Sequence, residues 1–210
     1  MLGPDALKLL EVLCESMTLE PNMRVLDMGC GKGLTSIFLA KTYGVTVFAN
    51  DLWISQTENY KRFVEAGVDD KVFPIKAEAH ALPYAEGFFD VAISIDAYHY
   101  FGTDEMYFPK FYSGLVKDKG QFGMVSPCLT REFGTSLPER LKSHWDNEMY
   151  TFHSPQWWRH LWEKTGLVDI KKSELIPDGK EIWRSTADFD LHEADDEDYL
   201  SLFLQTAIKR

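Results

Sequence analysis

The sequence contains little cysteine. Its three cysteines are odd in number and lie far apart along the 210 residues, at Cys14, Cys30 and Cys128. This pattern suits neither a disulfide framework nor a clustered metal site. Two histidines of the second half, His144 and His153, have no third ligand at a fixed spacing. We therefore expect a reducing, cytoplasmic setting and no bound metal.

A long apolar run is also missing. No stretch of about 18 uncharged apolar residues is present that would span a bilayer. Residues 1–17 carry acids and lack the basic segment and the unbroken apolar run of a signal peptide. We therefore expect no attachment to a membrane.

Positive charge is scarce. The 22 lysines and arginines are outnumbered by 33 acids, which gives a formal charge of −11. Binding to a nucleic-acid backbone depends on clustered Lys and Arg, so we expect no nucleic acid as the main partner. The apolar share of 45% is ordinary for a globular protein. The length predicts a single domain over residues 1–210.

Short β-branched runs alternate with longer segments of helical period along the chain. This alternation is typical of a parallel α/β sheet. Helices are expected near residues 4–17, 33–43, 55–66, 105–116 and 154–165. Strands are expected at residues 24–27, 45–50, 71–75, 89–95, 120–125, 167–171 and 202–208.

Two stretches break this rhythm. Residues 126–153 and 176–200 hold prolines, aromatics and acids without a strand pattern. Irregular segments on a regular scaffold usually carry binding groups. We interpret residues 127–165 and 176–200 as insertions that cover the substrate, and residues 24–126 as the cofactor-binding half.

The most informative segment is a glycine-rich turn at residues 25–33 (VLDMGCGKG), which follows a strand and precedes an apolar helix. Its glycines allow a sharp turn and a close approach of ligand to backbone, and the helix start offers free N–H groups. A P-loop is excluded because Lys32 is followed by glycine instead of Ser or Thr. A dinucleotide fingerprint requires Gly-x-Gly-x-x-Gly, whereas these glycines lie at positions 29, 31 and 33.

This turn resembles the acidic-x-Gly-x-Gly-x-Gly loop of class I S-adenosylmethionine-dependent methyltransferases. Asp27 is the main discriminator, because a carboxylate two residues before the first glycine would repel a pyrophosphate but suits a cofactor with an ammonium and a sulfonium. The resemblance implies that S-adenosyl-L-methionine (SAM) binds here and leaves as S-adenosyl-L-homocysteine (SAH). The implied contacts in this turn are Asp27, Gly29, Cys30, Gly31 and Gly33.

Three later segments continue the resemblance in order. Asp51 lies at the end of a strand, 51 − 33 = 18 residues beyond Gly33, where an acid accepts hydrogen bonds from ribose hydroxyls. Residues 77–84 (AEAHALPY) resemble the family's adenine-contacting segment, with glutamate where aspartate is usual. Residues 87–91 (GFFDV) resemble the entry into the fourth strand. Together the matches cover about residues 24–126. They add Leu52, Glu78, Ala79 and Asp96 to the implied cofactor contacts.

The residues after the fourth strand are the first candidates for catalysis. Methyl transfer from a sulfonium is an in-line displacement, so the protein chiefly aligns the reactants and excludes water. A base is needed only when the acceptor must lose a proton. His99 is a candidate base, and Tyr98 is a second catalytic candidate. The alternative for His99 is a hydrogen bond to a backbone group or packing under the segment that covers the site, and the alternative for Tyr98 is packing in the core.

The acceptor is expected to be a small molecule. The strand end at residues 96–99 (DAYH) lacks the [Asp/Asn]-Pro-Pro-aromatic pattern of many enzymes that methylate amino groups of nucleic-acid bases or protein glutamine. Aromatic residues of the insertions either line a pocket for a flat or cationic acceptor or face the core. The expected substrate contacts are Tyr100, Trp145 and His153.

We therefore predict an α/β fold with a Rossmann-like, seven-stranded, mostly parallel sheet, helices on both faces and an antiparallel last strand. The predicted function is SAM-dependent methyl transfer to nitrogen, oxygen, sulfur or carbon of a small acceptor, by a monomer or homodimer. One alternative is an NAD(P)-binding oxidoreductase with an atypical glycine loop. Another is a non-catalytic SAM-binding module. A third, a lipid-modifying relative such as a cyclopropane synthase, is disfavoured because no amphipathic basic helix is present.

Overall fold

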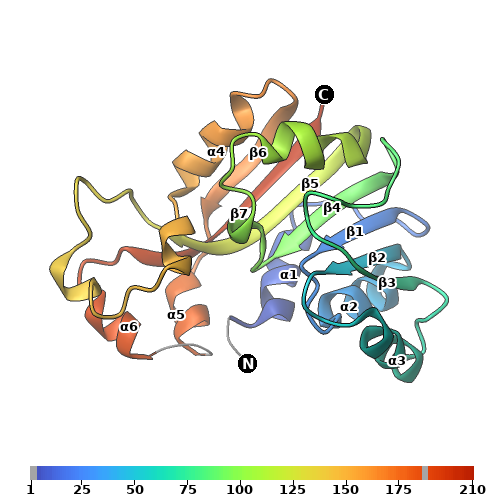
Figure 1. Ribbon diagram of the computed structural model, residues 1–210, viewed down its shortest axis with the longest axis horizontal. Helices are drawn as coiled ribbons and strands as arrows, with labels where there is room; N and C mark the ends of the chain where they lie inside the picture. Colours follow the sequence, from blue (N-terminus) through green and yellow to red (C-terminus); the bar gives the residue numbers. More distant parts are fainter. Residues whose placement is uncertain (1–3, 186–188) are drawn as a thin grey trace.

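The chain folds around one seven-stranded sheet of order β3-β2-β1-β4-β5-β7-β6 (Figure 1). The computed structural model describes residues 4–185 and 189–210. β1 to β5 run parallel to one another, and β7 runs antiparallel to both β5 and β6. The predicted seven strands and the antiparallel last strand are confirmed. The strands are β1 (Arg24–Met28), β2 (Thr46–Asp51), β3 (Val72–Lys76), β4 (Phe89–Ile95), β5 (Val116–Leu129), β6 (Val168–Leu175) and β7 (Leu200–Lys209).

The helices begin and end at residues whose side chains or backbone suit those positions. Asp5 accepts hydrogen bonds from two backbone N–H groups at the start of α1, and the Ser154 hydroxyl accepts one at the start of α4. Gly44 and Gly67 end α2 and α3 with positive φ angles, a conformation that favours glycine. The α-helices are α1 (Ala6–Cys14), α2 (Leu34–Tyr43), α3 (Gln56–Ala66), α4 (Pro155–Glu163), α5 (Gly179–Arg184) and α6 (Phe189–Ala194). The short turns are η1 (Tyr98–Tyr100), η2 (Phe108–Tyr112), η3 (Ser113–Leu115), η4 (Glu139–Leu141) and η5 (Glu148–Thr151).

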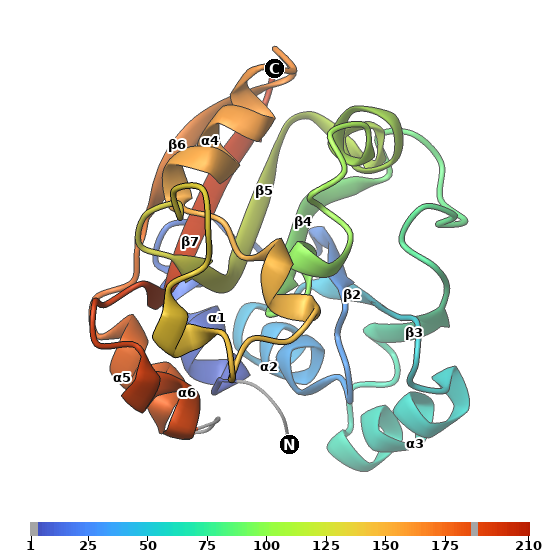
Figure 2. The ribbon, with the colours of Figure 1, turned by 60° about the vertical axis from the view of Figure 1, so that its left-hand side comes forward.

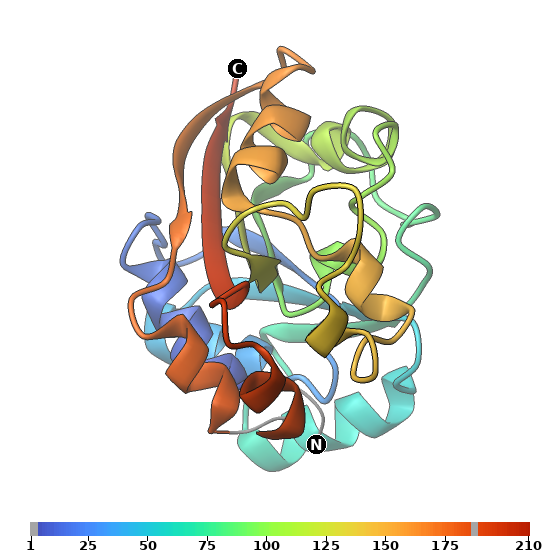
Figure 3. The same ribbon diagram turned by 90° about the vertical axis from the view of Figure 1, so that its left-hand side faces the viewer.

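Two separate cores hold the helices against the two faces of the sheet. One core joins α1, α2, α3 and α5 to the sheet through residues such as Leu10, Leu39 and Phe63. The other joins α4 and η2 to the opposite face through Trp162 and Phe108, whose rings stack at 4.5 Å. Figure 3 shows α4 on one side of β7 and α5 on the other. The predicted helices on both faces are therefore confirmed.

Three local predictions were wrong. Residues 105–116 form no α-helix: the π-helical turn η2 and the 3₁₀ turn η3 replace it, because Val116 pairs with Phe89 and enters β5. β5 continues to Leu129, beyond the predicted end at residue 125, because β7 pairs with it along its whole second half. Residues 176–200, expected to be irregular, contain α5 and α6. In the second and third cases a partner surface distant in sequence decides the outcome.

The carboxyl ends of β1, β2 and β4 meet at one edge of the sheet because these strands are parallel. The loop after each strand therefore lies beside the other two. In Figure 2 the segment that carries η4 and η5 crosses in front of the sheet near the turn that follows β4. The glycine loop, Asp51 and Asp96 lie at this edge. Among the residues that the structure describes, no helix has the length and apolar character to cross a bilayer.

Candidate functional site

The glycine loop joins β1 to α2 and is held by its neighbours through backbone contacts. The N–H groups of Gly29 and Cys30 both donate to the carbonyl of Asn50, at 2.9 and 3.0 Å. Gly29 has a φ of 77°, and a Cβ built there would overlap with the Cβ of Ala97. Glycine is required at this position because the residue that follows β4 packs directly on the loop.

Gly31, at the tip of the loop, faces open space. Its φ is 54°, and a Cβ built there would meet no atom within 4 Å. Its N–H donates to Oδ2 of Asp51 at 2.9 Å, and its carbonyl accepts from the Asn59 amide at 2.8 Å. The loop is therefore anchored from two sides while the space above its tip is free for a ligand.

Asp51 ends β2 and organises the turn after it. Its Oδ1 accepts from the N–H groups of Trp53 and Ile54, both at 2.8 Å, while Oδ2 accepts from Gly31. A carboxylate has about four acceptor positions, so one position on Oδ2 remains for a further donor such as a ribose hydroxyl. Leu52 and Trp53 are 47% and 70% exposed beside it.

Asp27 lies beneath the glycine loop and has almost no exposed surface. Its Oδ2 accepts from the hydroxyls of Thr35 and Ser36, at 2.7 and 2.6 Å, in the first turn of α2. Burial raises the pKa of Asp27, and these two hydrogen bonds partly oppose the rise. Burial also raises the pKa of the Cys30 thiol well above its usual value. Asp27 thus joins β1 to α2, while Cys30 contributes its backbone to the loop.

Glu78 and Ala79 follow β3. The Glu78 carboxylate lies 2.7 Å from Nδ1 of His80, and this hydrogen bond is the main cause that lowers the pKa of Glu78. The carbonyl of Ala79 accepts from the Tyr107 hydroxyl at 3.5 Å. Both residues lie on the loop where the family resemblance placed the adenine contact.

Asp96 begins the turn after β4 in a left-handed conformation, with a φ of 55°. Its backbone N–H donates to the carbonyl of Val125 at 2.8 Å. Burial raises the pKa of its carboxyl to about 7. A non-glycine residue in this conformation is uncommon, and such residues cluster at functional sites.

Tyr98 and His99 are both buried in the turn after Asp96. Tyr98 has no exposed surface, and its ring contacts those of Tyr112 and Trp162. Burial lowers the pKa of His99 to about 3, and its Nδ1 lies 3.4 Å from the Ser126 hydroxyl. An imidazole with so low a pKa is neutral and a weak base at neutral pH, so the geometry favours the packing alternative for both residues.

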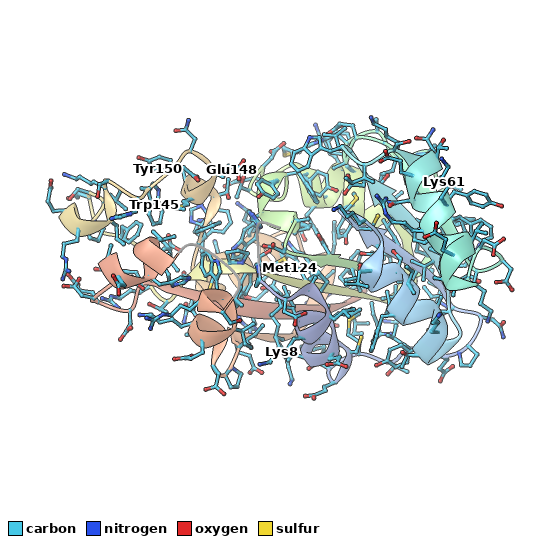
Figure 4. All side chains as sticks on the ribbon, turned by 90° about the horizontal axis from the view of Figure 1, so that it is seen from below. Lys8, Lys61, Met124, Trp145, Glu148 and Tyr150 are labelled. Atoms are coloured by element: carbon cyan, nitrogen blue, oxygen red, sulfur yellow. The ribbon has the colours of Figure 1, made fainter. Side chains whose placement is uncertain are left out.

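The three expected substrate contacts do not form one group. Tyr100 is 44% exposed, and its hydroxyl donates to Glu148 at 3.1 Å. Trp145 packs against the rings of Phe133 and Phe152. His153 stacks on Trp157, with the ring centroids 3.8 Å apart. Figure 4 shows Trp145, Glu148 and Tyr150 near one another. Only Tyr100 therefore lies on the turn after β4, at the edge that the glycine loop shares.

Two exposed residues of this edge, Trp53 and Glu148, were missed by the sequence analysis. The position of Trp53, two residues after Asp51, was a usable signal because the turn after β2 borders the cofactor loop. The contact of Glu148 with Tyr100 spans 48 residues, so no local pattern could indicate it.

A separate hollow of about 550 Å³ lies between η4 and α6 and is lined by Arg140, His144, Glu193 and Ala194. No residue of the glycine loop lines it. Within the described parts of the chain, no three His, Cys, Asp or Glu residues gather as metal ligands.

Comparison with known proteins agrees with the motifs. A family model described as a methyltransferase domain matches residues 25–118. The sarcosine/dimethylglycine N-methyltransferase of Halorhodospira halochloris is 31% identical over 158 residues, which cover 74% of this chain and 55% of that enzyme. The chain belongs to the class I SAM-dependent methyltransferases.

Other methyltransferases are related more distantly. The sterol 4-C-methyltransferase strm-1 of Caenorhabditis elegans is 27% identical over 144 residues, which cover 66% of this chain and 42% of that protein. The chain thus spans less than half the length of this relative. A putative sarcosine dimethylglycine methyltransferase from Galdieria sulphuraria has the same fold, with a TM-score of 0.77 at 17% identity over 96% of this chain and 84% of that chain.

The neutral state of His99 in this methyltransferase leads to a prediction about stability. Below pH 6.5 the unfolded chain protonates His99 while the native state does not, until about pH 3. Asp96 acts oppositely, because between about pH 4 and 7 the native state retains a proton that the unfolded chain has released. His99→Gln should therefore lower the slope of unfolding free energy against pH, and Asp96→Asn should raise it, each by up to about 1.4 kcal/mol per pH unit.

Urea unfolding between pH 4 and 8 measures these slopes. The slope of the unfolding free energy against pH is compared, and not the free energy at one pH, because either replacement can also change the stability by the same amount at every pH. Slopes equal to that of the wild type would contradict a neutral, buried His99 and a protonated Asp96.

Proposed function

We propose that this chain binds SAM along the carboxyl ends of β1, β2 and β4 and transfers its methyl group to a small-molecule acceptor. The observation that carries the proposal is the open space above Gly31, beside the remaining acceptor position of Asp51. A cofactor lying on the loop tip can approach the backbone there and donate a ribose hydroxyl to Asp51. The family membership and the small-molecule methyltransferases among the relatives support the same activity.

The residues proposed to hold the cofactor have separate tasks. Gly29, Gly31 and Gly33 shape the loop, and Cys30 contributes its backbone. Asp51 and Leu52 face the ribose side, and Asp27 supplies negative charge beneath the loop. The remaining contacts are proposed for Glu78 and Ala79 near the adenine and for Asp96 near the methionine moiety.

The chain's part in the reaction is to position the cofactor and the acceptor and to enclose them. When bound, the cofactor supplies a methyl group on a positively charged sulfur, which an acceptor displaces in line. The turns after β2 and β4, together with residues 127–165 and 176–200, are proposed to orient the acceptor and to exclude water. His99 and Tyr98 are proposed to support this turn by packing. The protein is further proposed to act as a monomer or homodimer in the cytoplasm, without a nucleic-acid partner.

Calorimetric titration with SAM and SAH tests the proposal, together with a matched pair of glycine variants. Gly31→Ala and Gly166→Ala both place a methyl group on a left-handed residue with open space around it, so each should cost about 1–2 kcal/mol of stability. Only Gly31→Ala should also weaken cofactor binding, by about tenfold or more, because its methyl group occupies the space proposed for the ligand.

Failure of the wild-type protein to bind either SAM or SAH would overturn the proposal. Equal affinity of both variants for SAH would remove Gly31 from the site. A non-catalytic SAM-binding module is distinguished by a second assay, since it would bind SAH but transfer no labelled methyl group to any small acceptor.

A further inference from the structure

Two exposed aromatic rings meet edge to face beside the glycine loop. Trp53 follows Asp51 at the end of β2, and Tyr100 ends η1 after β4. Their ring centroids are 6.1 Å apart, at an interplanar angle of 74°. Both side chains are exposed, so their ring surfaces are accessible to a ligand.

A carboxylate is held against this pair. The Tyr100 hydroxyl donates to Oε2 of Glu148 at 3.1 Å. The backbone N–H of Glu148 donates to Oδ1 of Asp146 at 2.8 Å, which fixes the start of η5. Glu148 is exposed. One carboxylate oxygen thus remains for a ligand that approaches the two rings.

The negative charge at this edge has no matching positive charge. Burial raises the pKa of Tyr100, and the nearby carboxylates of Glu148, Asp96 and Asp146 raise it further. In the ranges 4–185 and 189–210, none of these three acids forms an ion pair with Lys, Arg or His. The largely buried Asp96 side chain accepts no hydrogen bond from any described residue.

We infer that Trp53, Tyr100 and Glu148 form the acceptor site and that they select a positively charged amine; this inference rests on the proposed methyl transfer. The faces of aromatic rings attract cations, and the free carboxylate oxygen accepts from an ammonium N–H or opposes a substituted ammonium. An anionic acceptor would be repelled by the uncompensated carboxylates of Glu148 and Asp146. A neutral acceptor could donate a hydrogen bond to a carboxylate but would lack the attraction between opposite charges.

Transfer to the nitrogen of such an acceptor balances without any further reactant. The ammonium first loses one proton to solvent, which frees the nitrogen lone pair. That lone pair forms the new C–N bond while the S–C bond breaks, with its electrons left on sulfur. The methylated product is again a cation.

A comparison of the binding of a cation with that of its neutral isostere tests the inference. Choline and 3,3-dimethylbutan-1-ol have the same shape but differ in one positive charge. Each is titrated into the wild-type protein with and without SAH, so that the preference is measured whether or not the cofactor product binds. We expect choline to bind about tenfold more tightly than the alcohol.

Variants test whether the preference for choline over the alcohol depends on Trp53 and Glu148. Glu148→Gln and Trp53→Leu should each reduce the preference for choline to about threefold or less, because each removes one attraction for the charge. Glu65→Gln removes an exposed acid of α3 and should leave the preference unchanged. Retained SAH affinity in all three variants shows that they fold.

Equal binding of choline and the alcohol to the wild type would overturn the inference, and so would a preference that survives both Glu148→Gln and Trp53→Leu. SAH binding alongside equal probe binding would leave the proposed methyl transfer intact. Failure of the wild-type protein to bind SAH would instead count against the proposed function.

Discussion

Replacement of Asp51 by alanine is expected to lower the affinity for SAM by about 100-fold or more. The carboxylate accepts from the N–H groups of Gly31, Trp53 and Ile54, and one acceptor position is left for the cofactor ribose. Alanine removes that acceptor and also leaves the three N–H groups without their partner. Both the glycine loop and the turn after β2 would lose their common anchor.

Calorimetry with SAM and SAH measures this loss. Asp51→Asn keeps one acceptor oxygen and should bind with intermediate affinity, whereas Asp69→Ala, on the exposed segment after α3, should bind as the wild type does. An Asp51→Ala protein that is folded and retains wild-type affinity would show that the ribose does not contact this residue.

The second large effect is expected for Gly29→Ala, which should lower the free energy of unfolding by about 2–5 kcal/mol. One part of the loss comes from the φ of 77°, which disfavours any residue with a Cβ. The other part comes from overlap of the new Cβ with the Cβ of Ala97. Urea unfolding at pH 7 measures the sum.

Two controls separate the parts. Gly67→Ala has a similar φ of 66° and open space around it, so it should lose only the first part, about 1–2 kcal/mol. The double variant Gly29→Ala/Ala97→Gly removes the overlap and should recover part of the packing loss. A loss in Gly29→Ala no greater than that in Gly67→Ala would contradict a tight contact between the loop and Ala97.

The cofactor half was the more predictable half. β1, β2 and β4 have short apolar runs; the glycine loop follows β1 and Asp51 ends β2, at a spacing that can be read along the chain. Local patterns suffice there because a parallel strand, its turn and its helix are continuous in sequence. The region from residue 105 onward was harder to predict from the sequence. The start and the end of β5 depend on pairing with Phe89 and with β7, which lie far away in the sequence.

The catalytic and substrate residues show the same limit. Tyr98, His99 and Tyr100 are consecutive, yet the first two are buried and the third is half-exposed. The sequence pattern cannot show which of the three side chains is buried and which is exposed, because a 3₁₀ turn points neighbouring side chains in different directions. Burial then decides whether an imidazole keeps its ordinary pKa.

The order of the strands along the chain and the cofactor loop could be predicted from the sequence by itself, because glycine spacing and strand patterns are local, and the order of these motifs resembles one family. The tertiary structure alone decided which residues share the edge where the acceptor is proposed to bind. Trp53, Tyr100 and Glu148 come from three separate segments, and only the folded sheet places their rings and carboxylate side by side. Contacts between side chains far apart in sequence depend on packing, which no local pattern records.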